Sequence, residues 1–129
     1  MEAAALREMF SAFGPVDVRR MFSSIGIFAD GMMIALVSRE IVYLKSDADT
    51  APAFDQEGME PFSYATRGGG LRVMTQYRRM PDRLYDDPDE LAQWARAALG
   101  VATRAAVRAG RTTGRKGRAS PRKAIPPGC

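Results

Sequence analysis

The sequence has no histidine and a single cysteine, Cys129, at its last position. Without histidine, the chain lacks the commonest general base and the commonest transition-metal ligand of proteins. One thiol cannot form an internal disulfide or a cysteine cluster for zinc, and such sparse use of cysteine is typical of a reducing compartment. We therefore predict a cytoplasmic domain with no catalytic residues, no metal site and no cofactor.

Long apolar runs are also missing. No stretch approaches the roughly 18 uncharged apolar residues of a membrane helix. Glu2, Arg7 and Glu8 interrupt the start of the chain, where a signal peptide would be apolar. This pattern predicts no membrane association. The composition, with 46% hydrophobic and 26% charged residues, is that of one globular domain with a single core.

Acidic residues are absent from residues 103–129. This segment has a charge of +8 and the whole chain has +4, so residues 1–102 have −4. From Gly110 onward, glycine, proline, serine and basic residues dominate without periodicity, which is typical of disorder. We predict a folded domain over residues 1–102 and a basic, disordered tail over residues 103–129. The basic residues of this tail are Arg104, Arg108, Arg111, Arg115, Lys116, Arg118, Arg122 and Lys123.

The basic tail has two interpretations. Spaced basic residues in a flexible background neutralise the phosphates of DNA or RNA without reading their sequence. Alternatively, the tail is passive: it keeps the protein soluble or contacts the acidic body. Both interpretations stay open at this point. No aromatic residue lies beyond Trp94, so we do not expect the tail to stack on bases.

Helical periodicity marks the start of the chain. Across residues 3–13, the large apolar side chains recur at spacings of three and four residues, which predicts a short amphipathic helix. Gly14-Pro15 follows at once and is a strong stop signal.

The clearest helix begins near the other end of the folded part. Asp87 is the expected N-cap, Pro88 occupies the first helical position, and Glu90 can bond back to the cap. Gly100 either ends this helix or lies inside it, in which case the alanine-rich residues 101–109 extend it.

Three β-rich runs follow the first helix, over residues 16–29, 32–37 and 41–45. Asp30-Gly31 separates the first two and is a strong hairpin signal, because a type I′ turn needs positive φ at both central residues. Residues 32–37 are apolar on both faces and are expected to form a central strand covered on both sides. The three runs predict an antiparallel meander.

The next segment changes period. Residues 46–58 predict a short, mostly solvated helix that ends at Gly58. The runs 61–66 and 71–80 flank the glycine-rich residues 67–70, which predicts a second hairpin rather than a phosphate-binding loop, because no Lys-Ser/Thr pair follows. The order helix, three strands, helix, two strands, helix predicts an α+β fold of two layers, with the helices on one face of an antiparallel five-stranded sheet.

Two arginine pairs, Arg19-Arg20 and Arg78-Arg79, lie near strand ends and are candidate surface contacts. Adjacent residues of a strand point to opposite faces, so each pair sends one guanidinium outward and the other toward the helices or an edge. The inward member then needs an acidic partner. We favour ion pairs within the body over phosphate binding, a preference that reverses if both pairs converge on one face.

Two other groups of residues have plain structural interpretations. The acidic cluster before the last helix is favoured there by capping and by the helix dipole, rather than by acid-base chemistry. It consists of Asp82, Asp86, Asp87, Asp89 and Glu90. The numerous methionines fill irregular cores by default, although thioethers also line adaptable partner-binding grooves.

Several motifs together resemble the N-terminal domain of the TfoX/Sxy family, bacterial proteins linked to regulation of competence for DNA uptake. The resemblance spans about residues 4 to 100 and is carried by the run RRMFSSIGIFADGMMIALVSREIVYLKSD, by AFDQEGMEPFSY and by DPDELAQWARAAL. It implies a two-layer fold similar to that of secretion chaperones, which bind proteins and are often dimers. It implies no catalytic residues.

Three functional hypotheses follow. The leading one is a non-enzymatic regulatory or adaptor domain that contacts a protein partner, with a tail that adds non-specific attraction to nucleic acid. The alternative is a small-molecule-binding domain or enzyme with a site between sheet and helices, where Arg20, Arg79 or Tyr77 converge. The third is a homodimer in which an exposed sheet edge pairs with its copy.

Overall fold

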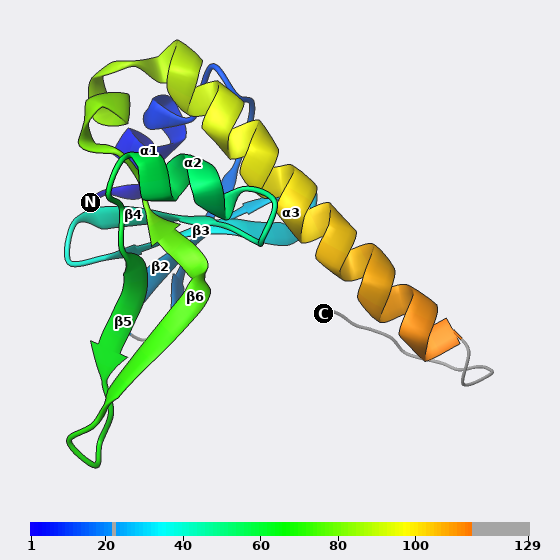
Figure 1. Cartoon of the computed structure of the whole chain (residues 1–129). Coiled ribbons are helices and arrows are strands. Elements are labelled where there is room, and N and C mark those ends of the chain that lie inside the picture. Colours follow the sequence, from blue (N-terminus) through cyan, green and yellow to red (C-terminus); the bar gives the residue numbers. More distant parts are fainter. Residues whose placement is uncertain (22, 115–129) are drawn as a thin grey trace.

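The computed structural model describes residues 1–21 and 23–114. In this part of the chain, helices pack against one face of an antiparallel sheet, which confirms the predicted α+β class (Figure 1). The elements are α1 (Ala3–Met9), β1 (Asp17–Met21), β2 (Ser24–Ala29), β3 (Met32–Ser38), β4 (Ile41–Lys45), α2 (Ala51–Gln56), β5 (Pro61–Ala65), β6 (Leu71–Arg79), the 3-10 helix η1 (Asp82–Asp86) and α3 (Pro88–Gly114).

The sheet has six strands, in the order β1-β2-β3-β4-β6-β5, and not the predicted five. The run predicted as one strand over residues 16–29 folds back on itself, with Met21 paired to Ser24. The reason lies in the phase of the alternation. Val16 and Val18 are even-numbered whereas Ile25 and Ile27 are odd-numbered, so a single strand would send the two sets to opposite faces. A turn between β1 and β2 puts all of them on the core side.

Two tight turns set the register of the central strands. Asp30 and Gly31 have φ of 53° and 78°, which confirms the predicted type I′ hairpin between β2 and β3. Arg39 and Glu40 between β3 and β4 also have positive φ, 54° and 66°, although neither is glycine. This conformation costs each of them on the order of 1 kcal/mol. It is imposed because Ser38 pairs with Ile41 and leaves only two residues for the loop.

The main core lies between the helices and one face of the sheet. Leu6 and Phe10 dock the short α1, and Phe54 docks α2 with its ring centroid 5.0 Å from that of Trp94. Helix α3 presents Ala95 and other small side chains, so its backbone can approach the sheet closely. The fully buried members of this core include Leu6, Phe10, Ile27, Ile34, Ala35, Val42, Leu44, Met80, Leu84, Leu91 and Ala95.

Helix α3 runs through Gly100 and continues to Gly114. This settles the alternative at Gly100 and corrects the expected disorder for residues 103–114, whose backbone is helical. Alanine-rich sequence has the highest helix propensity, and burial of Val101 and Ala102 offsets the roughly 1 kcal/mol cost of an interior glycine. Residues 115–129 lie outside the described part, so the division into domain and tail stays a prediction.

A side-chain network ties the start of α3 to α2 and η1. The Asp87 carboxylate accepts a hydrogen bond from the Glu90 backbone N–H at 3.2 Å, which confirms the N-cap. The Glu90 carboxylate does not return to the cap as predicted. It accepts hydrogen bonds from Arg83 and from Trp94 Nε1. Arg83 also pairs with Glu57, so one guanidinium joins three segments.

This network predicts a weaker acid sensitivity in a Glu90→Gln variant. Hydrogen bonds from Arg83 and then Trp94 hold the pKa of Glu90 below its ordinary value. The resulting stabilisation is complete above the pKa of the unfolded chain, about 4.3, and disappears as pH falls through the lower pKa of the folded state. The free energy of unfolding in urea should therefore fall more steeply below about pH 5 for the parent than for the variant. Asp89→Asn, in the same helical turn and without a described ion pair, is the control. Equal slopes in parent and Glu90→Gln would contradict the expectation.

Candidate functional site

The arginine pair of β6 divides between the two faces of the sheet. The Arg78 side chain is 13% exposed and lies on the helix side. Its Nε and Nη2 donate hydrogen bonds to the Met59 carbonyl at 3.0 and 2.8 Å, and its Nη2 also pairs with the Asp55 carboxylate. Arg78 is thus the inward member of its pair and has the acidic partner that such a position requires.

Arg79 lies on the other face, opposite Tyr43 in the register. Its two terminal nitrogens approach Glu60 at 3.3 Å and Asp82 at 3.4 Å. These ion pairs are exposed to solvent, so each contributes little to stability. The two neighbouring arginines therefore contribute differently to stability: Arg78 is expected to contribute more than Arg79.

The arginine pair of β1 divides in the same way. The Arg19 guanidinium lies 4.6 Å from the ring centroid of Phe28, on the face opposite the helices. Arg20 pairs in the register with Ile25, which packs against the main core, so it belongs to the helix side and is exposed there. One arginine of each pair lies on each face, and the pairs do not converge as a four-arginine phosphate site would require.

The face of the sheet opposite the helices carries a second apolar cluster. Leu36, Phe62 and Tyr77 are buried there although none of the described helices covers this face (Figure 1). Neighbouring side chains cover them: the Tyr43 and Phe62 rings meet edge to face at 4.9 Å, and Phe62 stacks with Tyr64 at 5.8 Å. The expectation that residues 32–37 are covered by two layers is therefore wrong in one respect, because a side-chain cluster replaces the second layer.

The cluster extends toward β1 across Gly26. A Cβ atom at this glycine would lie 2.8 Å from Phe28 Cε1 and 3.0 Å from Met21 Cε, so these side chains fold over the bare backbone. We define the aromatic face as the continuous set of large side chains on this side of the sheet. Its members are Met21, Phe28, Met33, Leu36, Tyr43, Phe62, Tyr64, Met74 and Tyr77.

Sequence reasoning missed the aromatic face because it assigned the methionines to the core by default. A signal was present in Met32-Met33, since neighbours in a strand cannot share a face. Met33 indeed packs on the aromatic face.

One lysine contacts the buried part of the aromatic face. The Lys45 ammonium lies 5.7 Å from the ring centroid of Tyr77. Burial lowers the pKa of Lys45 and raises the pKa of Tyr77 to about 12. At neutral pH, Tyr77 is a protonated phenol, as tyrosine ordinarily is, and can donate a hydrogen bond. No carboxylate of the described residues lies within ion-pair distance of Lys45.

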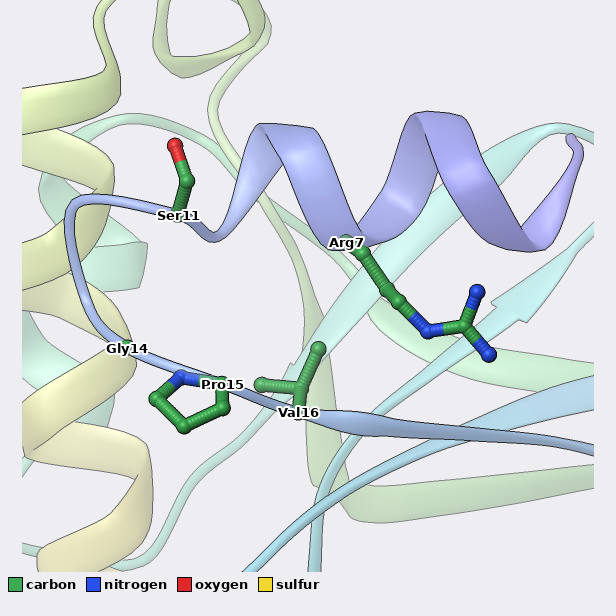
Figure 2. Close-up of a pocket in the computed structure, with 5 residues that line it drawn as sticks. All are labelled: Arg7, Ser11, Gly14, Pro15 and Val16. Atoms are coloured by element: carbon green, nitrogen blue, oxygen red, sulfur yellow. The ribbon is translucent and has the colours of Figure 1, made fainter.

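A shallow hollow of about 260 Å³ lies between α1 and the start of β1 (Figure 2). Arg7, Ser11, Gly14, Pro15 and Val16 line it. The Arg7 guanidinium and the Ser11 hydroxyl point in different directions, so they do not converge on a common ligand position. None of Arg20, Arg79 and Tyr77, the residues expected in a small-molecule site, lines this hollow.

Among residues 1–21 and 23–114, no group of three or more histidine, cysteine, aspartate or glutamate side chains is placed to hold a metal ion. None of the helices in this part is both long and apolar enough to cross a membrane.

The predicted basic tail is described only in part. The Arg104 guanidinium donates a hydrogen bond to the Asp47 carboxylate at 2.9 Å, so it ties α3 to the turn before α2. Arg104, Arg108 and position 111 follow at helical spacings of four and three, on one side of the α3 backbone. The remaining candidates, Arg115, Lys116, Arg118, Arg122 and Lys123, lie outside the described residues.

Comparison with known proteins gives a family match. The sequence model of the TfoX N-terminal domain matches residues 8–102, which is more than half of the chain. The matched range contains all six strands and ends inside α3. A search of curated proteins found no match.

Proposed function

The chain belongs to the TfoX N-terminal domain family of regulatory domains, and from this premise we propose that it is a non-enzymatic adaptor that binds a protein partner through the aromatic face. The basic residues of the C-terminal segment add non-specific attraction to DNA or RNA. The two contacts use different parts of the chain.

The observation that supports protein binding is an apolar cluster on a sheet face that none of the described helices covers. Leu36, Phe62 and Tyr77 are buried there among Met33, Tyr43 and Met74, and Tyr64 beside them is 42% exposed. Continuous apolar patches that combine aromatic and methionine side chains are typical of protein interfaces.

The observation that supports nucleic-acid contact is the charge of +8 over residues 103–129, which carry no acidic residue. Helix α3 leaves the sheet and carries the first part of this segment away from the body (Figure 1). Phosphate contacts of this kind need no base-reading side chains.

We expect a Tyr64→Asp variant to lose the protein partner. The full chain and its variants are used to capture proteins from the native cell, with nuclease present to remove nucleic-acid bridges. An aspartate at this exposed position places a charge in the proposed contact and, although it removes the ring stacked on Phe62, leaves the main core between sheet and helices unchanged. Proteins captured by the parent should be depleted at least about tenfold with the variant, a loss of about 1.4 kcal/mol of binding free energy.

Val73→Asp is the matched control. Val73 is 50% exposed and lies on the same β5–β6 hairpin, but on the opposite side from Tyr64, because it pairs with Ser63 in the register. The proposal predicts unchanged capture by this variant. Equal loss with both variants, or with neither, would show that the aromatic face is not the docking surface.

A further inference from the structure

We infer that the aromatic face binds a peptide segment that combines large apolar side chains with carboxylates, and that Lys45 receives one of these carboxylates. The inference rests on the proposed protein-binding role of this face and adds the chemistry of the partner.

The charges of this face favour an acidic ligand. Arg19 and Lys45 lie on it, and Arg72 joins them because it pairs with Tyr64 in the register. None of these three cations has an ion pair among the described residues. Of the acidic residues on this side, Glu60 and Asp82 are both engaged by Arg79, and Asp17 lies on the edge strand β1 opposite Phe28. Cations without an ion pair among the described residues therefore lie beside the apolar side chains of the aromatic face.

Lys45 is the cation with the strongest need for a partner. Its ammonium is half-buried over the Tyr77 ring and has no carboxylate partner among residues 1–21 and 23–114; burial lowers its pKa. A carboxylate brought by a ligand would compensate this desolvation and form a charge-assisted hydrogen bond in a partly dry site.

The apolar part of the face suits side chains of a peptide. Met33 and Met74 pack at the margin of the buried cluster, and Met21 folds over Gly26. Unbranched thioethers can change rotamer to fit different apolar side chains. Tyr64, which is exposed, and Tyr43, which is partly exposed, add rigid aromatic rings.

Other occupants fit less well. A second copy of the chain would bring two positive faces together, which is unfavourable. A single-stranded nucleic acid needs rings with open faces for base stacking. Phe62 and Tyr77 are only 8% and 6% exposed, and Arg19 covers the Phe28 ring, so of the rings on this face Tyr64 is exposed and Tyr43 only partly so.

The test uses a display library of random 12-residue peptides selected on the full chain. Enriched peptides are then measured one by one, by fluorescence anisotropy, against the parent and single variants. The expected peptides carry aspartate or glutamate among large apolar residues. Lys45→Met keeps the apolar stem and should weaken their binding about tenfold or more, with a smaller dependence on salt. Arg67→Met, at the hairpin tip, removes one positive charge elsewhere and should leave binding unchanged.

The outcomes separate this inference from the proposed function. Selected peptides without acidic residues, which bind the Lys45→Met variant normally but not the Tyr64→Asp variant, would contradict the inferred acidic ligand. They would still support protein docking on the aromatic face. Selected peptides that bind the Tyr64→Asp variant as well as the parent would contradict both the inferred ligand and the proposed function. If the parent binds a fluorescent dT12 oligonucleotide and Lys45→Met and Tyr64→Asp weaken this binding, the face is assigned to nucleic acid. If the parent self-associates and Tyr64→Asp abolishes the association, the face is assigned to a second copy. Either result would overturn the inference.

Discussion

Replacing seven basic residues of the C-terminal segment with glutamine is expected to lower the affinity for duplex DNA by on the order of a hundredfold at about 50 mM salt. The seven are Arg108, Arg111, Arg115, Lys116, Arg118, Arg122 and Lys123. Arg104 is kept, because its contact with Asp47 holds α3 to the body. Each phosphate contact contributes about 0.9 to the slope of log K against log salt, so two lost contacts already account for this change.

The control for this variant preserves charge. Replacing the arginines among the seven residues with lysine keeps every positive charge, so affinity and salt slope should stay within about twofold of the parent. Affinity is measured by titration of a labelled duplex at several salt concentrations. Equal binding by the glutamine variant and the parent would assign the tail the passive role and remove it from the mechanism.

Replacing Arg78 with alanine is expected to lower the free energy of unfolding by about 2–3 kcal/mol. The substitution leaves the Met59 carbonyl without two hydrogen bonds and the Asp55 carboxylate without its partner. It also removes the guanidinium that lies 5.9 Å from the Phe54 ring centroid and thereby loosens α2. Because Asp55 itself is largely exposed, the loss should fall below that of a fully buried ion pair.

Arg79→Ala is the matched control, one residue along the same strand. Its ion pairs with Glu60 and Asp82 are exposed, so we expect a loss of less than about 1 kcal/mol. Urea unfolding of both variants measures the difference. Similar losses for the two arginines would contradict the assignment of Arg78 to the helix side and of Arg79 to the aromatic face.

The positions of the two proposed contacts are compatible with an adaptor. Helix α3 packs against the core through Leu91 and Ala95, and its last turns project beyond the sheet (Figure 1). The aromatic face lies on the side of the sheet away from α3. On the proposed function, a protein partner and a nucleic acid would contact different surfaces of the domain and would not compete.

Features that depend on a few neighbouring residues were predicted well from the sequence. The Asp30-Gly31 turn, the Asp87 cap and the glycine-rich hairpin each depend on backbone preferences that act within four or five residues. The alternation of β6 also showed that Arg78 and Arg79 must separate. It could not show which of them is buried, because this depends on which face of the sheet the helices cover.

The sequence by itself determined the family, the α+β class and the local turns and caps, since these follow from short-range preferences and periodicity. The tertiary structure alone decided that all the described helices cover one face and leave the other to an aromatic cluster, and that Lys45 is half-buried there without a carboxylate partner among the described residues. Burial depends on contacts between residues far apart in the chain, such as Tyr43 with Phe62 and Lys45 with Tyr77. Local sequence does not specify such contacts, because the free energy of burial is set by the whole packed molecule.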